Sequence, residues 1–158
     1  MKVSIIGQGY VGLTISVFAG EHHNVIGFDK NQGVVDALNA GKSDIEGVAS
    51  TDLTQLIAEG KYKATTDAAE IAGSDVIIIA VPTPLTKDRK PDLSFVEAAC
   101  KTVGENVKLP ALIINESTSF PGTVRNLIKP LIEKYSGGVE HLYAVSPERV
   151  EPSLSVSS

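Results

Sequence analysis

The sequence Val3-Ser4-Ile5-Ile6-Gly7-Gln8-Gly9-Tyr10-Val11-Gly12 sets an apolar run directly before a G-x-G-x-x-G pattern. A helical pattern begins within this motif and continues to about residue 20. A strand, a glycine turn and a helix in this order are the context that makes the motif specific for a dinucleotide phosphate site. We therefore predict that this stretch forms the first strand–turn–helix unit of a Rossmann-type α/β fold.

The three glycines of this motif have separate mechanical reasons. Gly7 is predicted to make the tight turn out of the strand, and Gly12 is predicted to let the helix pack close to the sheet. Gly9 has no side chain, so the backbone can approach a pyrophosphate at the positive N-terminus of the helix. Tyr10 and Val11, in the first turn of that helix, are predicted to lie against the same ligand. A glycine turn that serves packing only is the alternative.

A second apolar run, residues 24–28, ends at Asp29, which follows Gly12 by 17 residues. An acid at this place hydrogen-bonds the ribose hydroxyls of NAD and repels the 2′-phosphate of NADP. The sequence therefore predicts an NAD site. Lys30 is next to Asp29 and could weaken the repulsion, so NADP stays an alternative, as does an FAD-type use of the same fold.

Short β-branched runs alternate with helical patterns along the chain. Several runs are continuously apolar, which is typical of strands buried on both faces of a parallel sheet. The alternation predicts a doubly wound, six-stranded, mainly parallel sheet with helices on both faces. The predicted strands are 3–6, 24–28, 62–65, 75–81, 111–115 and 142–145, and the predicted helices are 10–20, 31–40, 51–59, 67–72, 93–107 and 122–135.

Polar residues and a proline indicate where three of these helices begin. Asp67 is predicted to cap the helix over 67–72, with Glu70 reaching back in a capping box. Asp92 is predicted to cap the helix over 93–107. Pro121 lies where the last helix should begin, a position that suits a residue without a backbone N–H.

The composition limits the class of protein and its partners. A chain of 158 residues with 42% apolar residues fits one globular domain, and a net charge of −5 without a basic stripe argues against a nucleic-acid partner. The single cysteine, Cys100, excludes an intrachain disulfide and cysteine-based zinc sites of the usual spacing. Its helical surroundings predict a small buried hydrophobe rather than a nucleophile. With no signal peptide and no membrane span in the pattern, we expect a soluble, cytoplasmic protein.

Three later segments follow predicted strands and should reach the same edge of the sheet. Val81, Pro82 and Thr83 follow the fourth strand and are predicted to form a wall of the cofactor cleft, with a rigid connection as the alternative. Thr118 belongs to a hydroxyl-rich run after the fifth strand, where capping of the next helix is the alternative. Glu148 follows the sixth strand, where its carboxylate could act as a base, with a solvated surface charge as the alternative.

Four ordered motifs carry a family resemblance: Gly7-Gln8-Gly9-Tyr10-Val11-Gly12-Leu13, Val81-Pro82-Thr83-Pro84-Leu85, Glu116-Ser117-Thr118 with Pro121-Gly122-Thr123, and Ser146-Pro147-Glu148-Arg149. Together they resemble the successive motifs of the UDP-glucose/GDP-mannose dehydrogenase family. The last two look most similar to the branch that acts on UDP-N-acetylhexosamines, such as UDP-N-acetylmannosamine and UDP-N-acetylglucosamine. The resemblance extends to about Pro152 and covers the first domain of the family's architecture.

The resemblance implies a two-step, NAD-dependent oxidation of a sugar C6 alcohol to a carboxylate, through a cysteine-bound thiohemiacetal and thioester. By this resemblance, Thr118 matches the threonine that helps to hold the catalytic water, and Glu148 matches the acid that assists thioester hydrolysis. Thr83 and Thr118 would also line the cofactor cleft. These roles are chemically sensible, because hydrolysis of a thioester needs a placed water and a base.

The sequence also departs from the family's pattern. The family's nucleophilic cysteine lies in a later Cys-x-Pro-Lys-Asp motif that is not found here, and the lysine and asparagine of the central helix are not found either. We therefore expect an NAD-binding domain over 1–150, a frayed tail over 151–158, and no central helix or nucleotide-sugar-binding domain. We expect NAD binding without turnover by the chain alone and UDP-sugar binding only with the second domain, and a homodimer is left open. A stand-alone NAD(H)-binding regulatory or sensor module is the alternative.

Overall fold

A single six-stranded sheet forms the centre of the computed structural model, which describes residues 1–146. The strand order is β3-β2-β1-β4-β5-β6, and every neighbouring pair is parallel. The predicted doubly wound fold class is thereby confirmed. The strands are β1 Lys2–Ile6, β2 Asn24–Phe28, β3 Tyr62–Thr65, β4 Val76–Ile79, β5 Leu112–Asn115 and β6 Leu142–Val145.

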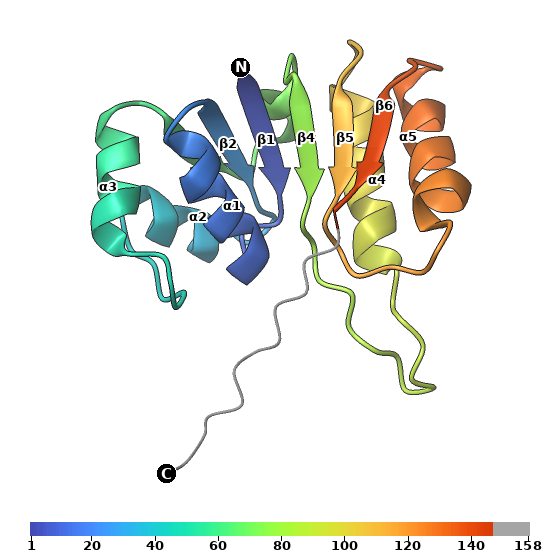
Figure 1. The fold of residues 1–158 in the computed structure, drawn as a ribbon, viewed down its shortest axis with the longest axis horizontal. Helices are drawn as coiled ribbons and strands as arrows, with labels where there is room; N and C mark the ends of the chain where they lie inside the picture. The colour runs from blue at the N-terminus through green and yellow to red at the C-terminus, as the bar shows by residue number, and fades with distance from the viewer. Residues whose placement is uncertain (147–158) are drawn as a thin grey trace.

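Helices cover the sheet on both sides (Figure 1). The helices over residues 10–20, 32–39 and 50–58 pack on one side of the sheet, and the helices over residues 94–106 and 129–136 pack on the other. Within residues 1–146, no helix is long and apolar enough to cross a membrane. The helical elements are α1 Tyr10–Gly20, α2 Gln32–Asn39, α3 Ser50–Ala58, the 3₁₀ turn η1 Ala68–Ile71, α4 Ser94–Asn106, the π turn η2 Val124–Ile128 and α5 Lys129–Ser136.

The apolar runs of the central strands supply two cores, one on each side of the sheet, because successive side chains of a strand point to opposite faces. In β1, Ile5 packs into the core that contains Leu13 of α1. The next residue, Ile6, packs into the core that contains Val96 of α4. Ile5, Leu13 and Val96 are each 0% exposed. The continuous apolar pattern in the sequence is explained by this burial on both faces.

The last predicted helix forms in two parts, a π turn followed by a regular helix, because of Pro130. Pro121 and Gly122 form a turn in which Gly122 has a φ of 88°, so the helix begins only after them. Pro130 has no N–H to donate to the carbonyl four residues before it, and its ring clashes with that carbonyl in a regular helix. The chain widens instead into the π turn η2, where the N–H of Lys129 donates to Val124 O.

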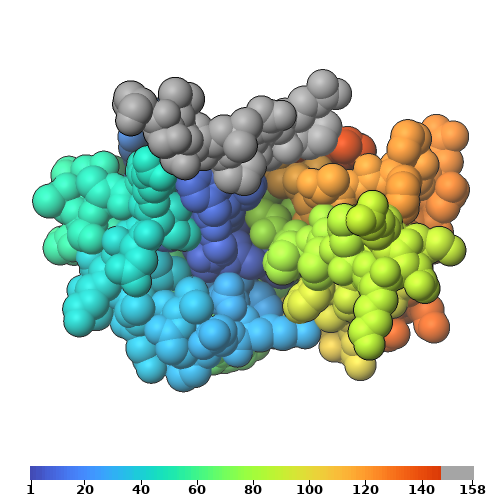
Figure 2. All heavy atoms as spheres, turned by 90° about the horizontal axis from the view of Figure 1, so that it is seen from below, coloured from blue at the N-terminus to red at the C-terminus, as the bar shows by residue number. Residues whose placement is uncertain are grey.

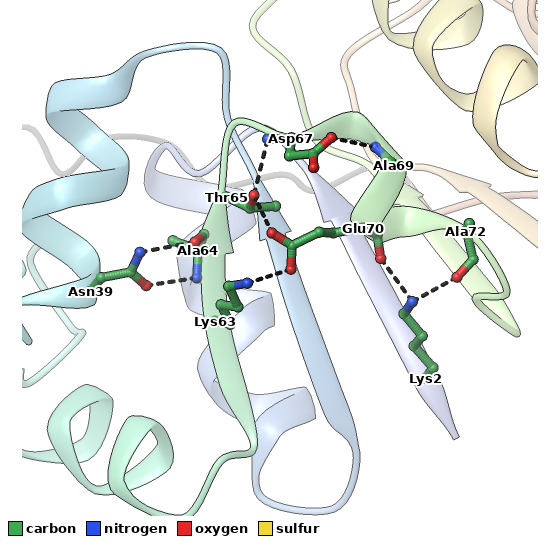
Figure 3. A network of polar contacts seen from close by, with 9 residues as sticks. All are labelled: Lys2, Asn39, Lys63, Ala64, Thr65, Asp67, Ala69, Glu70 and Ala72. Carbon is green, nitrogen blue, oxygen red and sulfur yellow. Dashed lines mark hydrogen bonds and ion pairs between the residues drawn. The ribbon is translucent and has the colours of Figure 1, made fainter.

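The predicted capping box at Asp67 is half right (Figure 3). The Asp67 carboxylate does accept from the N–H of Ala69, at 2.9 Å. The backbone N–H of Asp67, however, donates to Thr65 Oγ1 at 3.0 Å rather than to Glu70. The Glu70 carboxylate accepts from Lys63 Nζ at 2.6 Å and from Thr65 Oγ1 at 2.8 Å. The prediction for Glu70 is therefore wrong, because strand β3 brings stronger partners to this carboxylate than the local backbone offers.

Two further contacts fasten the same region (Figure 3). Lys2 Nζ donates to the carbonyls of Glu70 and Ala72, at 2.7 and 2.6 Å, and so joins the start of β1 to η1. The side chain of Asn39 at the end of α2 pairs with both backbone groups of Ala64, each at 2.9 Å. Edge strand β3 is therefore held by the side chain of Asn39 as well as by its pairing with β2.

We expect Glu70→Gln to lower the free energy of unfolding by about 1 kcal/mol at pH 7. The hydrogen bond from Lys63 is the main cause that lowers the pKa of Glu70 below its ordinary value of 4.5. A lowered pKa means that the folded state binds the proton less tightly, so the contribution is complete above pH 4.5 and is lost as the pH falls through the folded pKa. Urea unfolding of both proteins at pH 7 and at pH 3 measures this difference.

The matched control for this prediction is Glu105→Gln, in the exposed pair of Lys101 and Glu105 on α4. Exposed ion pairs of this kind contribute little. The Glu105 variant should therefore unfold almost like the unmodified chain at both pH values. A Glu70→Gln effect of equal size at pH 7 and pH 3 would contradict the assignment to the ionised carboxylate.

Candidate cofactor site

A cleft of about 570 Å³ opens where the carboxyl ends of β1, β2 and β4 meet the first turns of α4. Figure 2 looks onto this end of the sheet, where the dark blue N-terminal segment lies between the light blue segment after β2 and the yellow-green segment before α4. The cleft is therefore at the place where strand order reverses, which is the usual ligand site of this fold. Its lining consists of Ile6, Gly7, Gly9, Tyr10, Val11, Phe28, Asp29, Lys30, Asn31, Ala80, Val81, Pro82, Phe95, Ala98, Ala99 and Thr102.

The three motif glycines have three different environments. Gly7 has a φ of 94°, and a Cβ there would lie 2.7 Å from Ala80 O. A Cβ on Gly12 would lie 1.8 Å from Gly7 O, so helix α1 can pack against the turn only with glycine at this position. A Cβ on Gly9 would meet nothing within 4 Å. Gly7 and Gly12 are thus required by the protein itself, whereas Gly9 leaves room for something else.

Helix α1 presents an open N-terminus to the cleft. Its N-cap is Gly9, which is extended and offers no side chain to accept from the first N–H groups. The first turn of the helix carries no acidic residue. The free N–H groups and the positive end of the helix dipole therefore face the space beside Gly9, which suits a pyrophosphate.

The Asp29 carboxylate at the end of β2 is held in place by two backbone N–H groups. Its Oδ2 accepts from the N–H of Gln8 and its Oδ1 accepts from the N–H of Asn31, each at 2.9 Å. Each carboxylate oxygen still has a free lone pair, which can accept from a ribose hydroxyl. Gly7 N donates to Phe28 O at 2.8 Å, so the glycine turn and the end of β2 are joined by backbone as well.

Helix α4 forms an apolar wall of the cleft that the sequence reading missed. Phe95, Ala98, Ala99 and Thr102 line it, and Phe95 is 46% exposed. These positions follow the i, i+3, i+4, i+7 spacing of one helix face. The sequence did contain a signal for this wall: these four positions form a stripe on the helix next to the stripe of larger side chains that packs into the core. An apolar wall opposite a few polar groups is typical of a site for a flat organic ring.

The residues predicted after β4 divide between the cleft and its surroundings. Val81 and Pro82 line the cleft, and the half-buried Thr83 does not belong to its lining. Gly12 is also outside the lining, because it is buried beneath the turn. Contact of any of these residues with a cofactor stays a prediction.

The hydroxyl-rich run after β5 is used largely for internal structure. Ser117 Oγ donates to Val81 O at 2.8 Å and so joins the loops that follow β4 and β5. The side-chain amide of Asn115 donates to Ser119 Oγ at 3.1 Å, and Ser119 does not cap the next helix. Thr118 is exposed and is not part of the cleft lining. Glu148 lies outside the described residues 1–146, and the roles of Thr118 and Glu148 stay predictions.

The interpretation of Cys100 as a buried hydrophobe is confirmed. The residue is 0% exposed and packs in the core under α4. Burial raises the pKa of the Cys100 thiol to about 12. A thiol with this pKa is protonated at neutral pH, whereas the reactive form of a cysteine is the thiolate.

The sheet order, the glycine turn and the acid at the end of β2 define a Rossmann-type dinucleotide-binding domain. Sequence comparison makes this class more specific, because residues 1–158 match the model of the UDP-glucose/GDP-mannose dehydrogenase family, NAD binding domain. The chain therefore belongs to the UDP-glucose/GDP-mannose dehydrogenase family, as the resemblance of its motifs indicated, and corresponds to the NAD-binding domain of that family.

Individual relatives have related activities. The chain is 39% identical to the UDP-N-acetyl-D-mannosamine dehydrogenase of Pyrococcus horikoshii, over 96% of this chain and 37% of that protein. It is 38% identical to the GDP-mannose 6-dehydrogenase of Pseudomonas putida, over 99% of this chain and 38% of that protein. A ternary complex of GDP-mannose dehydrogenase from Pseudomonas aeruginosa matches with a TM-score of 0.85 and 36% identity, over 96% of this chain and 37% of that one. The chain thus spans well under half of the length of these relatives.

Proposed function

We propose that the chain binds NAD or NADH in the cleft beside the glycine turn and presents it for the oxidation of a nucleotide sugar in the whole protein. The observation that carries this proposal is the arrangement of three groups around one cleft: the open N-terminus of α1, the unfilled space at Gly9 and the fixed carboxylate of Asp29. Each suits one part of the dinucleotide, and the family match supports the same cofactor.

In this proposal the pyrophosphate lies against the first N–H groups of α1, over Gly9. The ribose next to the adenine donates its hydroxyls to Asp29, and the adenine lies against the apolar wall of Phe95 and Ala98 on α4. Val81 and Pro82 close the cleft on the side of β4. With the adenine end placed there, the nicotinamide end points toward the loops after β4 and β5. These loops contain Thr83 and Thr118.

For the whole protein we propose the oxidation of a C6 alcohol to a carboxylate, with UDP-N-acetylmannosamine as the first substrate to test and GDP-mannose as the second. The names of the relatives support both donors. NAD⁺ supplies the oxidising power: one alcohol, one water and two NAD⁺ give one carboxylate, two NADH and three protons. Assembly as a homodimer and a cytoplasmic location belong to this proposal.

Calorimetric titration with NAD and with NADP tests cofactor binding directly, and we expect NAD to bind more tightly. We further expect Asp29→Asn to weaken NAD binding about 10-fold and to reduce the difference between the affinities for NAD and for NADP. The amide loses the negative charge and places an NH₂ group where the carboxylate now accepts from a backbone N–H. Asp36→Asn on the exposed face of α2 is the control, since Asp36 is not part of the cleft lining. Equal losses in both variants would contradict a ribose contact at Asp29.

We expect no NADH formation when the purified chain is mixed with NAD and either nucleotide sugar. Covalent catalysis of this oxidation needs an accessible thiolate, and the only cysteine among the 158 residues is buried with a raised pKa. Absorbance of NADH at 340 nm measures turnover, and Cys100→Ala should keep NAD binding within about twofold of the unmodified chain. Sustained NADH formation by the unmodified chain and its loss in Cys100→Ala would contradict this expectation.

A further inference from the structure

Gln8, the residue between the first two motif glycines, turns its side chain away from the cleft. It is 2% exposed and is not part of the cleft lining. Its Oε1 accepts from Tyr62 Oη at 2.8 Å, a contact between the glycine turn and edge strand β3, 54 residues further along the chain. Ser16 Oγ of α1 donates to the same oxygen at 3.1 Å. A residue in the middle of the phosphate turn is therefore anchored by a hydroxyl of the edge strand and by a hydroxyl of α1.

The rest of Gln8 joins this anchor to the two groups proposed to hold the cofactor. Its Nε2 donates to the carbonyls of Ile5 and Gly7, each at 3.2 Å, and so holds the end of β1 and the start of the turn. Its backbone N–H donates to Asp29 Oδ2 at 2.9 Å. One residue thus connects the glycine turn, the acid at the end of β2 and the hydroxyl on β3.

The neighbouring strand leaves room for this connection. A Cβ on Gly27 of β2 would lie 2.5 Å from Gln8 Oε1 and 2.7 Å from Tyr62 Oη. Tyr62 itself is 3% exposed. Burial, together with the charge of Asp29, raises the pKa of the Tyr62 hydroxyl, so it keeps its proton and can donate. The glycine at position 27 therefore leaves the space in which Gln8 and Tyr62 meet.

We propose that Gln8 and Tyr62 are positioning residues of the NAD site, which hold the glycine turn and the Asp29 carboxylate in one fixed relation without touching the cofactor. This inference rests on the proposed function of the cleft. A dinucleotide contacts the turn and the acid at the same time, so its affinity depends on the distance between them being set before binding. A loss of the Tyr62 hydroxyl lets that distance vary.

The test compares Tyr62→Phe with Ser4→Ala. Ser4 is 0% exposed in β1, and its Oγ lies 2.7 Å from Ser74 Oγ. Its replacement, like that of Tyr62, removes one buried hydroxyl from a hydrogen-bonded pair. Ser74 Oγ still donates to Ile71 O, just as Gln8 Oε1 still accepts from Ser16. We expect both variants to melt at a lower temperature. Only Tyr62→Phe should raise the Kd for NAD, by about 3- to 10-fold, whereas Ser4→Ala should stay within about twofold.

A double-mutant cycle with Gln8→Met separates positioning from general destabilisation. Methionine keeps the length of the side chain but removes the acceptor of the Tyr62 hydroxyl. In the Gln8→Met background, Tyr62→Phe should therefore change the Kd by less than about twofold. Independent, multiplying losses in the cycle, or a Tyr62→Phe Kd equal to that of the unmodified chain, would overturn the proposal.

Amide hydrogen exchange in the cofactor-free chain gives a second readout. The exchange rate of the Gln8 N–H should rise in Tyr62→Phe and should stay the same in Ser4→Ala, because only Tyr62→Phe frees the turn from β3. If the unmodified chain shows no binding of NAD, the proposed function fails, while the exchange rate of Gln8 still decides whether Tyr62 holds the turn. Unchanged exchange in Tyr62→Phe would overturn the positioning role.

Discussion

Gly12→Ala is expected to lower the free energy of unfolding by about 3 kcal/mol or more. A Cβ on Gly12 would lie 1.8 Å from Gly7 O and 2.9 Å from Gly7 C, and both atoms belong to the backbone of the turn. No side-chain rotation can relieve this overlap. Helix α1 would have to move away from β1, which would loosen the packing of the fully buried Leu13. Urea or thermal unfolding followed by circular dichroism measures the change.

Gly9→Ala is the matched control for stability, because it adds the same methyl group three residues away in the same motif. Gly9 has a φ of −77° and a ψ of −161°, a conformation that alanine adopts without strain. A Cβ there meets nothing within 4 Å. Gly9→Ala should therefore unfold almost like the unmodified chain. Equal stability of the Gly12→Ala and Gly9→Ala proteins would contradict the packing role of Gly12.

Gly9→Ala is expected to have the largest effect on binding, raising the Kd for NAD by about 10- to 100-fold. The added methyl group occupies the space in which we place the pyrophosphate, and it separates the phosphate oxygens from the first N–H groups of α1. Charge-assisted hydrogen bonds of this kind are the strong ones in a site. Calorimetric titration of the folded variant with NAD measures the loss.

Adenosine serves as the control ligand for this variant, because it carries the base and the ribose but no phosphate. Its affinity for Gly9→Ala should stay within about threefold of its affinity for the unmodified chain. A parallel loss of NAD and adenosine binding would show that the methyl group disturbs the whole cleft. NAD binding unchanged by the substitution would contradict the placement of the pyrophosphate over Gly9.

Local signals in the sequence were sufficient for the phosphate turn and its acid. Gly7, Gly9 and Gly12 act within one turn, and Asp29 follows a strand whose length and position are set by its own apolar run. The six strands and the doubly wound class followed from the alternation of strand and helix patterns, because right-handed crossovers leave few ways to build a parallel sheet. These features depend on short segments and on general rules of chain connection.

Features that depend on how neighbouring elements pack, or on one residue inside a regular pattern, were predicted wrongly or missed. Glu70 has the sequence of a capping-box residue, but β3 brings Lys63 and Thr65 to its carboxylate. The face of α4 that lines the cleft was missed, since the helix carries two stripes and only its packing angle on the sheet decides which one faces the site. The π turn before α5 arises where Pro130 interrupts a helix that is otherwise well patterned.

The sequence by itself determined the strand–turn–helix unit, the acid that follows the second strand and the family to which the chain belongs, because those properties are encoded within contiguous motifs. Only the tertiary structure decided what surrounds them. It turns Gln8, a variable position of the motif, into a junction between the phosphate turn, Asp29 and Tyr62. The physical reason is that a hydrogen bond acts over about 3 Å in space, and only the folded sheet brings residues so far apart in the chain to that distance.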